Sequence, residues 1–99
     1  MFTIGNILKS NSGSGLRYIV AEISVDGVLH CLDAKLDGSP CASNTSSGPR
    51  YRTTKITPQE FGYFRFEVIG NCDARLIEEA MAIRARNADA DRKMFEARD

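Results

Sequence analysis

Three cysteines and a single histidine are the residues of this chain best suited to nucleophilic or metal chemistry: Cys31, Cys41, Cys72 and His30. A thiol nucleophile needs an adjacent base, and a zinc site needs closely spaced thiolates or imidazoles. No two cysteines form a CxxC pair, and adjacent residues of a strand, such as His30 and Cys31, point to opposite faces. An odd number of cysteines also does not suit a disulfide framework. The sequence therefore predicts reduced thiols, no metal site and no cofactor.

Carboxylates could supply general acid and base chemistry if several of them converged in one pocket. Here Glu22, Asp33, Glu60 and Glu67 show no recognisable spacing, and the sequence contains no phosphate-binding loop. We therefore expect a protein that is not an enzyme.

A basic segment is the first candidate for binding. It contains Arg50, Tyr51, Arg52 and Lys55, and Arg17 comes from a nearby strand end. Arginine and lysine can contact phosphates while a tyrosine stacks on a base, as in proteins that bind single-stranded nucleic acid. In a strand, however, Arg50 and Arg52 would face away from Tyr51 and Lys55. The alternative is a solvated sheet edge, whose charges discourage aggregation.

Composition points to one ordinary globular domain. The chain has 99 residues, 42% of them hydrophobic, and 13 basic residues balance 13 acidic ones. No apolar run is long enough to span a bilayer, and the N-terminal segment lacks the features of a signal peptide. We therefore expect a cytoplasmic protein without a membrane segment, and zero net charge assigns no partner class.

The elements that must position these residues are mostly strands. Alternation and β-branched residues predict strands over residues 2–8, 16–25, 28–36, 50–56 and 61–69, with a long polar loop over residues 37–49. In the second strand, Ile19, Ala21 and Ile23 should face the core, and in the last, Phe64, Phe66 and Val68.

Turn and cap signals join these strands. Asp26-Gly27 is typical of a type I′ hairpin turn, which needs positive φ at both central residues. Thr57 before Pro58, with Glu60 three residues after Thr57, forms a capping box and predicts one helical turn. Either Asn71 or Asp73 could cap a helix that continues toward the C-terminus.

That last helix has an interrupted apolar stripe. Five residues fall in one arc at 100° per residue: Leu76, Ile77, Ala80, Met81 and Ile83. The same arc then carries Arg84, Asn87 and Asp91, and the apolar character returns at Met94 and Phe95. Opposite charges four residues apart, Asp89 with Lys93 and Arg92 with Glu96, can support an exposed segment. The pattern fits two arrangements: the helix projects with an apolar end, or it folds back and completes the core.

Together these elements predict an α+β fold: a small antiparallel β-barrel or strongly twisted sheet over residues 1–70, with a long C-terminal α-helix over 71–99. The order of elements over residues 2–69 resembles that of the SH3-like small β-barrels, in which a short helical turn precedes the last strand, as "TPQEF" precedes "GYFRFEVI" here. The acidic loop and tryptophan of peptide-binding SH3 domains are absent. A compact barrel with an added helix also resembles accessory proteins of bacteriophages and other mobile elements.

Two functions remain open from the sequence. The first is a protein-interaction module, such as an inhibitor or regulator of a larger complex, which could also form a homodimer through the helix. Its expected contact residues are Met94, Phe95, Arg84, Asp91 and Asn44. The second is a nucleic-acid-binding barrel, with Arg50, Tyr51, Arg52, Lys55 and Arg17 as the contact residues.

Overall fold

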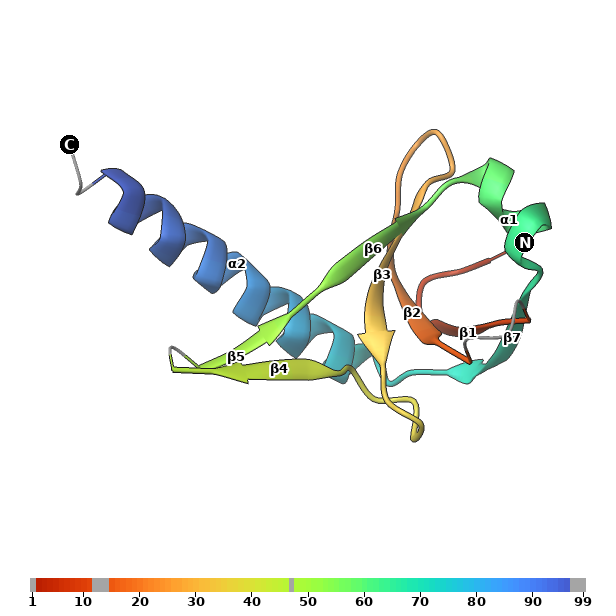
Figure 1. Ribbon diagram of the computed structural model, residues 1–99, viewed down its shortest axis with the longest axis horizontal. Helices are drawn as coiled ribbons and strands as arrows, with labels where there is room; N and C mark the ends of the chain where they lie inside the picture. The colour runs from red at the N-terminus through yellow and green to blue at the C-terminus, as the bar shows by residue number, and fades with distance from the viewer. Residues whose placement is uncertain (1, 12–14, 47, 97–99) are drawn as a thin grey trace.

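A computed structural model describes residues 2–11, 15–46 and 48–96, except for the side chain of Phe64. It shows an antiparallel sheet with a long C-terminal helix, so the coarse α+β prediction is confirmed (Figure 1). The main sheet has five strands in the order β6-β3-β2-β1-β7, and β4 and β5 form a separate hairpin. The elements are β1 Asn6–Ser10, β2 Arg17–Ile23, β3 Leu29–Ala34, β4 Ala42–Thr45, β5 Gly48–Tyr51, β6 Thr53–Ile56, α1 Pro58–Phe64, β7 Phe66–Asn71 and α2 Ala74–Glu96.

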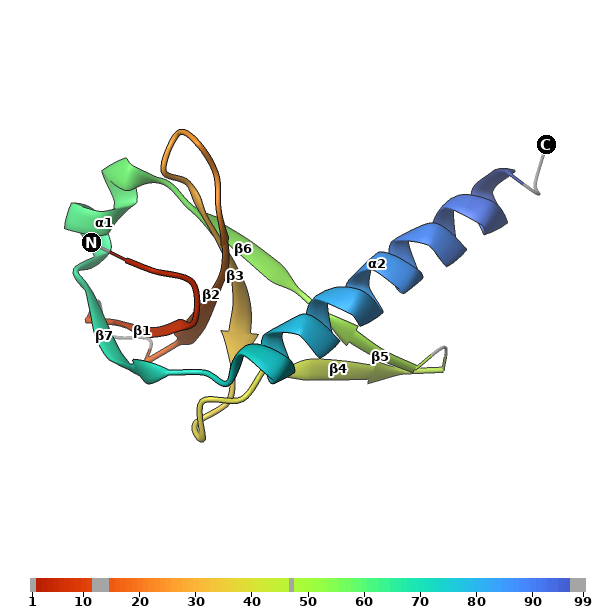
Figure 2. The ribbon, with the colours of Figure 1, turned by 180° about the vertical axis from the view of Figure 1, so that it is seen from behind.

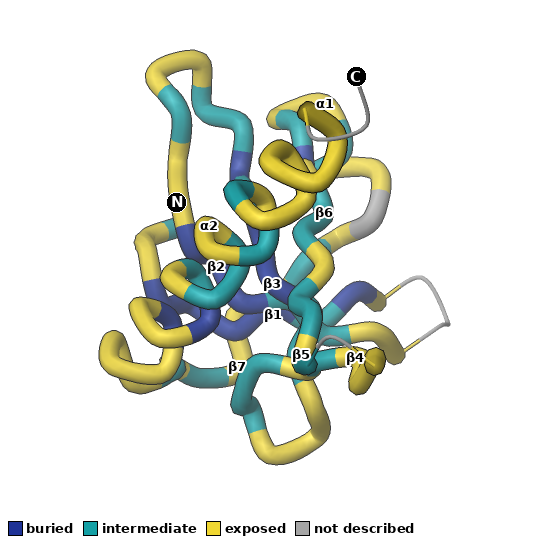
Figure 3. Tube along the Cα trace, turned by 90° about the vertical axis from the view of Figure 1, so that its left-hand side faces the viewer, coloured by how far each residue is buried: buried dark blue, intermediate teal, exposed yellow. Residues whose placement is uncertain are grey.

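The central strands are buried on both faces of the sheet. Ile7, Ile19, Ala21 and Leu32 pack with Ile77 and Ala80 of α2 on one face. On the other face, Leu8, Val20, Leu29, Cys31 and Ile56 pack with partly buried aromatic residues. Figure 3 shows this burial in β1, β2 and β3. The prediction of one apolar face for residues 17–23 was therefore incomplete, because Val20 is as buried as Ile19.

The ends of the sheet differ from the prediction. Strand β1 begins at Asn6 rather than Phe2, and Ile4 is exposed in a turn. The edge strands β6 and β7 pair only with β3 and β1, so the described residues contain no ladder that closes the sheet into a barrel. The chain crosses between these two edges through α1 (Figure 1).

The turn between β2 and β3 lies where the sequence predicts it but is of another type. Gly27 has a φ of 84°, whereas Asp26 is not among the residues with positive φ. The amide of Ser24 donates to the Val28 carbonyl, and the amide of Gly27 donates to the Ser24 carbonyl. A turn that ends in one left-handed glycine is a three-residue hairpin loop, so the type I′ prediction is wrong.

The predicted loop over residues 37–49 contains most of the β4–β5 hairpin, in which Ala42 pairs with Tyr51 and Thr45 with Gly48. The predicted strand over residues 50–56 is therefore two strands, interrupted at Arg52. The first half belongs to the hairpin, and the second half pairs with β3 in the main sheet.

Helix α1 is longer than the predicted single turn. The Glu60 carboxylate accepts hydrogen bonds from the amide and the hydroxyl of Thr57, which confirms the capping interaction. The helix then continues to Phe64 and ends at Arg65, whose φ of 50° is left-handed. The predicted strand over residues 61–69 is therefore wrong in its first half, and the observed strand β7 covers residues 66–71. Val68 is exposed there, whereas Phe66 packs against the core.

Helix α2 is one unbroken element that leaves the sheet. The Asp73 side chain accepts a hydrogen bond from the Arg75 amide at 2.9 Å and so caps the helix, rather than Asn71. Figures 1 and 2 show α2 running past the β4–β5 hairpin, away from α1. The radius of gyration is 14.7 Å, against about 13 Å for a compact domain of this length. No helix within the described ranges is long and apolar enough to cross a membrane.

Candidate functional site

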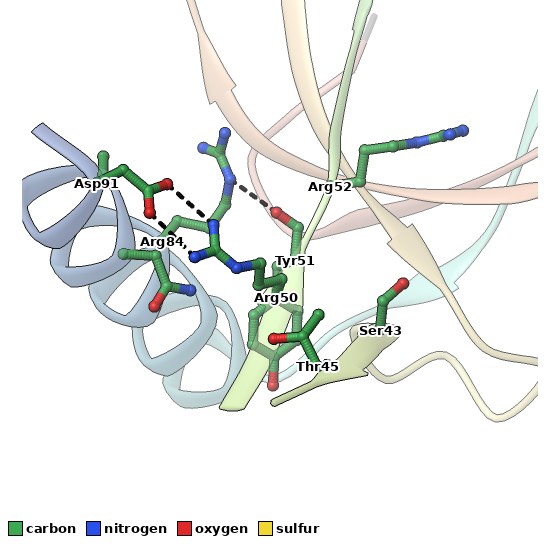
Figure 4. Close-up of a pocket in the computed structure, with 9 residues that line it drawn as sticks. Ser43, Thr45, Arg50, Tyr51, Arg52, Arg84 and Asp91 are labelled. Atoms are coloured by element: carbon green, nitrogen blue, oxygen red, sulfur yellow. Dashed lines mark hydrogen bonds and ion pairs between the residues drawn. The ribbon is translucent and has the colours of Figure 1, made fainter. Parts of the chain in front are cut away.

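A groove lies between the β4–β5 hairpin and the second half of α2 (Figure 4). We call it the polar groove, and its volume is about 350 Å³. It is lined by Ser43, Thr45, Arg50, Tyr51, Arg52, Arg84, Asn87, Ala88 and Asp91. It therefore brings residues of the predicted basic segment together with the polar positions of the C-terminal helix.

The spacing along α2 explains why polar residues line this groove. Ile77, Ala80, Arg84, Asn87 and Asp91 follow one another at intervals of three and four residues, so they share one face of the helix. The first two are buried against the sheet. Beyond them, the same face meets the hairpin, whose backbone offers carbonyl acceptors instead of apolar side chains. The interruption of the apolar stripe thus marks a change in what the helix packs against.

Arg50 and Asp91 form a bidentate salt bridge across the groove. Arg50 Nη1 donates to Asp91 Oδ2 at 3.0 Å, and Nη2 donates to Oδ1 at 3.1 Å. The hydrogen bonds from Arg50 lower the pKa of the Asp91 carboxyl below its ordinary value and raise the pKa of the Arg50 guanidinium. Both side chains are about half exposed, so solvent screens the pair. It therefore fixes geometry more than it adds stability.

Two further side chains of α2 bind the backbone of β5. Arg84 Nε donates to the Tyr51 carbonyl at 3.0 Å, and Asn87 Nδ2 donates to the Pro49 carbonyl at 3.1 Å. With the Arg50–Asp91 pair, they make three successive polar contacts along the helix. We call these contacts the seam, and they hold α2 against the hairpin for more than two turns beyond the core.

The remaining lining residues limit what the groove can bind. Arg52 extends away from Arg50 and Arg84, and its Nε lies 3.4 Å from Asp33 Oδ2 (Figure 4). The Tyr51 ring packs against the core beneath α2. Two of the three guanidinium groups therefore lie beside carboxylates, and the tyrosine face is partly covered.

The structure separates the other predicted contact residues from the polar groove. Lys55 is exposed on β6, and Asn44 is exposed on β4 opposite Pro49. Arg17 lies on β2, and its Nη1 donates to the Leu36 carbonyl at 3.1 Å. None of these three residues lines the groove, so the predicted basic cluster is not one surface.

Met94 and Phe95 lie beyond the polar groove. We call these two residues the α2 tip; Met94 is 61% exposed and Phe95 is 74% exposed. Met94 continues the face of Asn87 and Asp91, three residues after Asp91, at the point where the helix has passed the hairpin. Asp89 forms ion pairs with Lys93 and Arg92, so the expected Asp89–Lys93 pair is present.

Sequence reasoning missed the hairpin residues of the groove. The sequence predicts a loop for Ser43 and Thr45, because residues 37–49 are polar and contain two prolines and two glycines. The sequence identifies Asn87 as an interruption of the apolar stripe but does not indicate its hydrogen bond to the hairpin. The signal in the sequence is the spacing of Arg84, Asn87 and Asp91. These residues continue the helix face on which Ile77 and Ala80 are buried.

The three cysteines differ in their exposure to solvent. Cys31 is buried, and burial raises the pKa of its thiol to about 12. Cys41 is exposed and Cys72 is half-buried. Across residues 2–11, 15–46 and 48–96, no three His, Cys, Asp or Glu side chains are arranged to hold a metal ion.

No protein-family model, curated protein or solved structure matches this chain. The geometry of the sheet, the polar groove and the α2 tip is therefore the basis for assigning a function.

Proposed function

We propose that this protein is a non-enzymatic interaction module that presents the α2 tip to a protein partner, as a regulator or inhibitor of a larger complex would. The observation that carries the proposal is the exposure of Met94 and Phe95 at the end of an unbroken helix. Two adjacent large apolar side chains on a protruding helix are an unfavourable exposure that contact with a partner would remove. Methionine and phenylalanine are also residues that fill grooves in helix recognition.

The seam supports this proposal because it fixes the direction of the second half of α2. Arg84, Asn87 and Asp91 each bond to the hairpin, so the second half of α2 is held in place without apolar burial. A helix that is already ordered loses less conformational entropy on binding than one that folds on contact. The hairpin thus acts as a support for the α2 tip.

We extend the proposal to the fold family and place the sheet with the SH3-like small barrels. The last strand, β7, returns to pair with the first strand, β1. Helix α1 occupies the position before the last strand where that family carries a helical turn. This order supports the relationship, although strands β6 and β7 do not pair.

The experiment uses tip variants and a matched control. The double variant Met94→Ser/Phe95→Ser removes the two apolar side chains of the tip. The control, Leu16→Ser/Leu36→Ser, removes two exposed leucines that lie outside α2 and do not line the polar groove. Each protein is used as bait in a lysate of the source cells, and captured proteins are identified by mass spectrometry. We expect a partner that binds the parent chain and the control but is lost with the tip variant. Identical captured proteins for all three baits would contradict the proposal.

A second candidate is nucleic-acid binding at the polar groove, which is favoured by the presence of Arg50, Arg52 and Arg84 in its lining. Contacts to phosphates would make binding fall steeply with salt. The candidate predicts a shift of a labelled single-stranded oligonucleotide at low salt that disappears in Arg50→Ala/Arg52→Ala. Absence of any shift for the parent protein would eliminate it.

A further inference from the structure

An apolar groove lies at the end of the molecule opposite the α2 tip. We call it the α1 groove, and it is lined by Phe2, Ile23, Gly27, Leu29, Pro58 and Phe61. Its volume is about 630 Å³. Phe2 and Phe61 meet edge to face, with ring centroids 5.1 Å apart, and Leu29 is buried. The groove therefore offers aromatic edges and aliphatic groups to an apolar occupant.

The chain cannot fill this groove with its own α2 tip. The lining comes from the N-terminal segment, the β2–β3 turn and α1, which lie at one end of Figure 1, and α2 ends at the other. The molecule is 45 Å long, and α2 is a single helix over residues 74–96. Any contact between these two surfaces must therefore join two copies.

We propose that the α2 tip of one copy docks in the α1 groove of a second copy. The inference rests on the proposed function, and it identifies the partner of the tip as this chain itself. The Met94 thioether and the Phe95 ring match the chemistry of the site, because sulfur and aromatic edges both contact aromatic rings favourably. The chain thus carries an exposed apolar pair and an exposed apolar groove that suits it.

A second apolar groove formed by described residues suits the tip less well. It has a volume of about 280 Å³ beside the first half of α2, and Glu22 and Glu78 are among its lining residues. An apolar pair docked there would come close to two carboxylates, which favour water. The α1 groove has more than twice the volume and no charged residue in its lining.

Docking of this kind is head to tail, because the two surfaces in contact are different. A pair of copies keeps one free tip and one free groove, so association continues into an open chain unless a ring closes. A buried phenylalanine covers about 150–250 Å², so two side chains and their groove bury less than the roughly 1,200 Å² of a standard interface. We therefore expect weak association that is detected at high micromolar concentrations and above.

The test combines variants that each disable one of the two surfaces. Met94→Ser/Phe95→Ser disables the tip. Ile23→Glu and, separately, Pro58→Glu introduce a charge into the groove at exposed positions, so the core residues stay in place. Leu16→Ser/Leu36→Ser is the control. Far-UV circular dichroism and thermal melting establish that each variant is folded, and sedimentation equilibrium gives its mass against concentration.

We expect the average mass of the parent protein and of the control to rise with concentration. The tip variant alone and each groove variant alone should remain monomeric. An equimolar mixture of a tip variant with a groove variant should form a 1:1 heterodimer and no larger species, because only one functional tip and one functional groove remain to pair.

Three results would overturn the inference. They are a parent protein that stays monomeric at millimolar concentration, groove variants that associate like the parent, and a mixture that does not associate. If the groove variants associate but the tip variant does not, the tips pair with each other, so the groove is excluded and the proposed role of the tip stands. If the parent protein stays monomeric and the tip variant loses a partner captured from the lysate, self-association is excluded and the proposed function stands.

Discussion

Leu76 and Ile77 offer a direct test of how α2 sits on the sheet, because they are neighbours of similar size. Ile77 is 6% exposed and packs in the core beneath the helix, whereas Leu76 is 38% exposed. We predict that Ile77→Ala lowers the free energy of unfolding by about 3 kcal/mol, since it removes buried methyl groups and leaves a cavity. Leu76→Ala should cost about 1 kcal/mol or less, because its side chain is already partly in water.

The assay is urea denaturation followed by circular dichroism, with thermal melting as a second measure. A difference of about 2 kcal/mol corresponds to roughly 8–16 °C between the two melting temperatures for a domain of this size. The dependence of the free energy on urea should be equal in both variants, because the surface exposed on unfolding hardly changes. Equal losses, or a larger loss for Leu76→Ala, would show that the helix presents another face to the sheet.

Three further predictions concern single positions. Arg65→Gly should stabilise the protein by about 0.5–1 kcal/mol in urea denaturation, because the left-handed φ of 50° is strained for residues other than glycine; a destabilised variant would contradict this conformation. In native protein at pH 8, a maleimide should label Cys41 within minutes and leave Cys31 unmodified until denaturant is added, as mass spectrometry of peptides would show, since Cys31 is buried and its thiol pKa is about 12. Carbon NMR should show the Asp91 carboxyl titrating below its ordinary pKa of 3.8, and in Arg50→Gln its pKa should return toward that value. The ion pair therefore contributes to folding stability above pH 3.8, and this contribution is lost as the pH falls through the lowered pKa. An identical titration in both proteins would exclude the pair.

Local signals in the sequence predicted where the helices begin, although Asp26-Gly27 indicated the wrong type of turn. Thr57, Pro58 and Glu60 specify the start of α1 through groups within one turn, and Asp73 specifies the start of α2 in the same way. Such interactions need only the residues that make them. The ends of the elements depend on more distant contacts, and α1 therefore continues past the predicted single turn to Arg65.

The parts that the sequence did not predict depend on tertiary contacts. The β4–β5 hairpin has a polar composition that is typical of loops, and its β5 carbonyls are bound by Arg84 and Asn87 of α2. Those side chains are more than thirty residues away, so no local pattern indicates the hairpin. The polar groove was missed for the same reason, although the sequence did predict that Arg84 and Asp91 share a face with Ile77.

Burial on both faces of the sheet also exceeds what alternation can indicate. Ile19 and Val20 are adjacent and both fully buried, one beneath α2 and one among the aromatic residues of the opposite face. Alternation distinguishes a buried face from a solvated one only when one face meets water. The irregular register between Val20 and Glu22 further shifts the pattern along β2.

The central claim is that the second half of α2 projects from the sheet. Its most direct test is a nuclear Overhauser spectrum of a dilute sample labelled with ¹³C at the methionine methyl groups. Met81 packs against the core and serves as an internal control, so its methyl group should show cross-peaks to sheet residues. The Met94 methyl group should show cross-peaks only to protons of α2. Cross-peaks from Met94 to the sheet that persist on dilution would show that the helix folds back on its own chain, and would contradict both proposals.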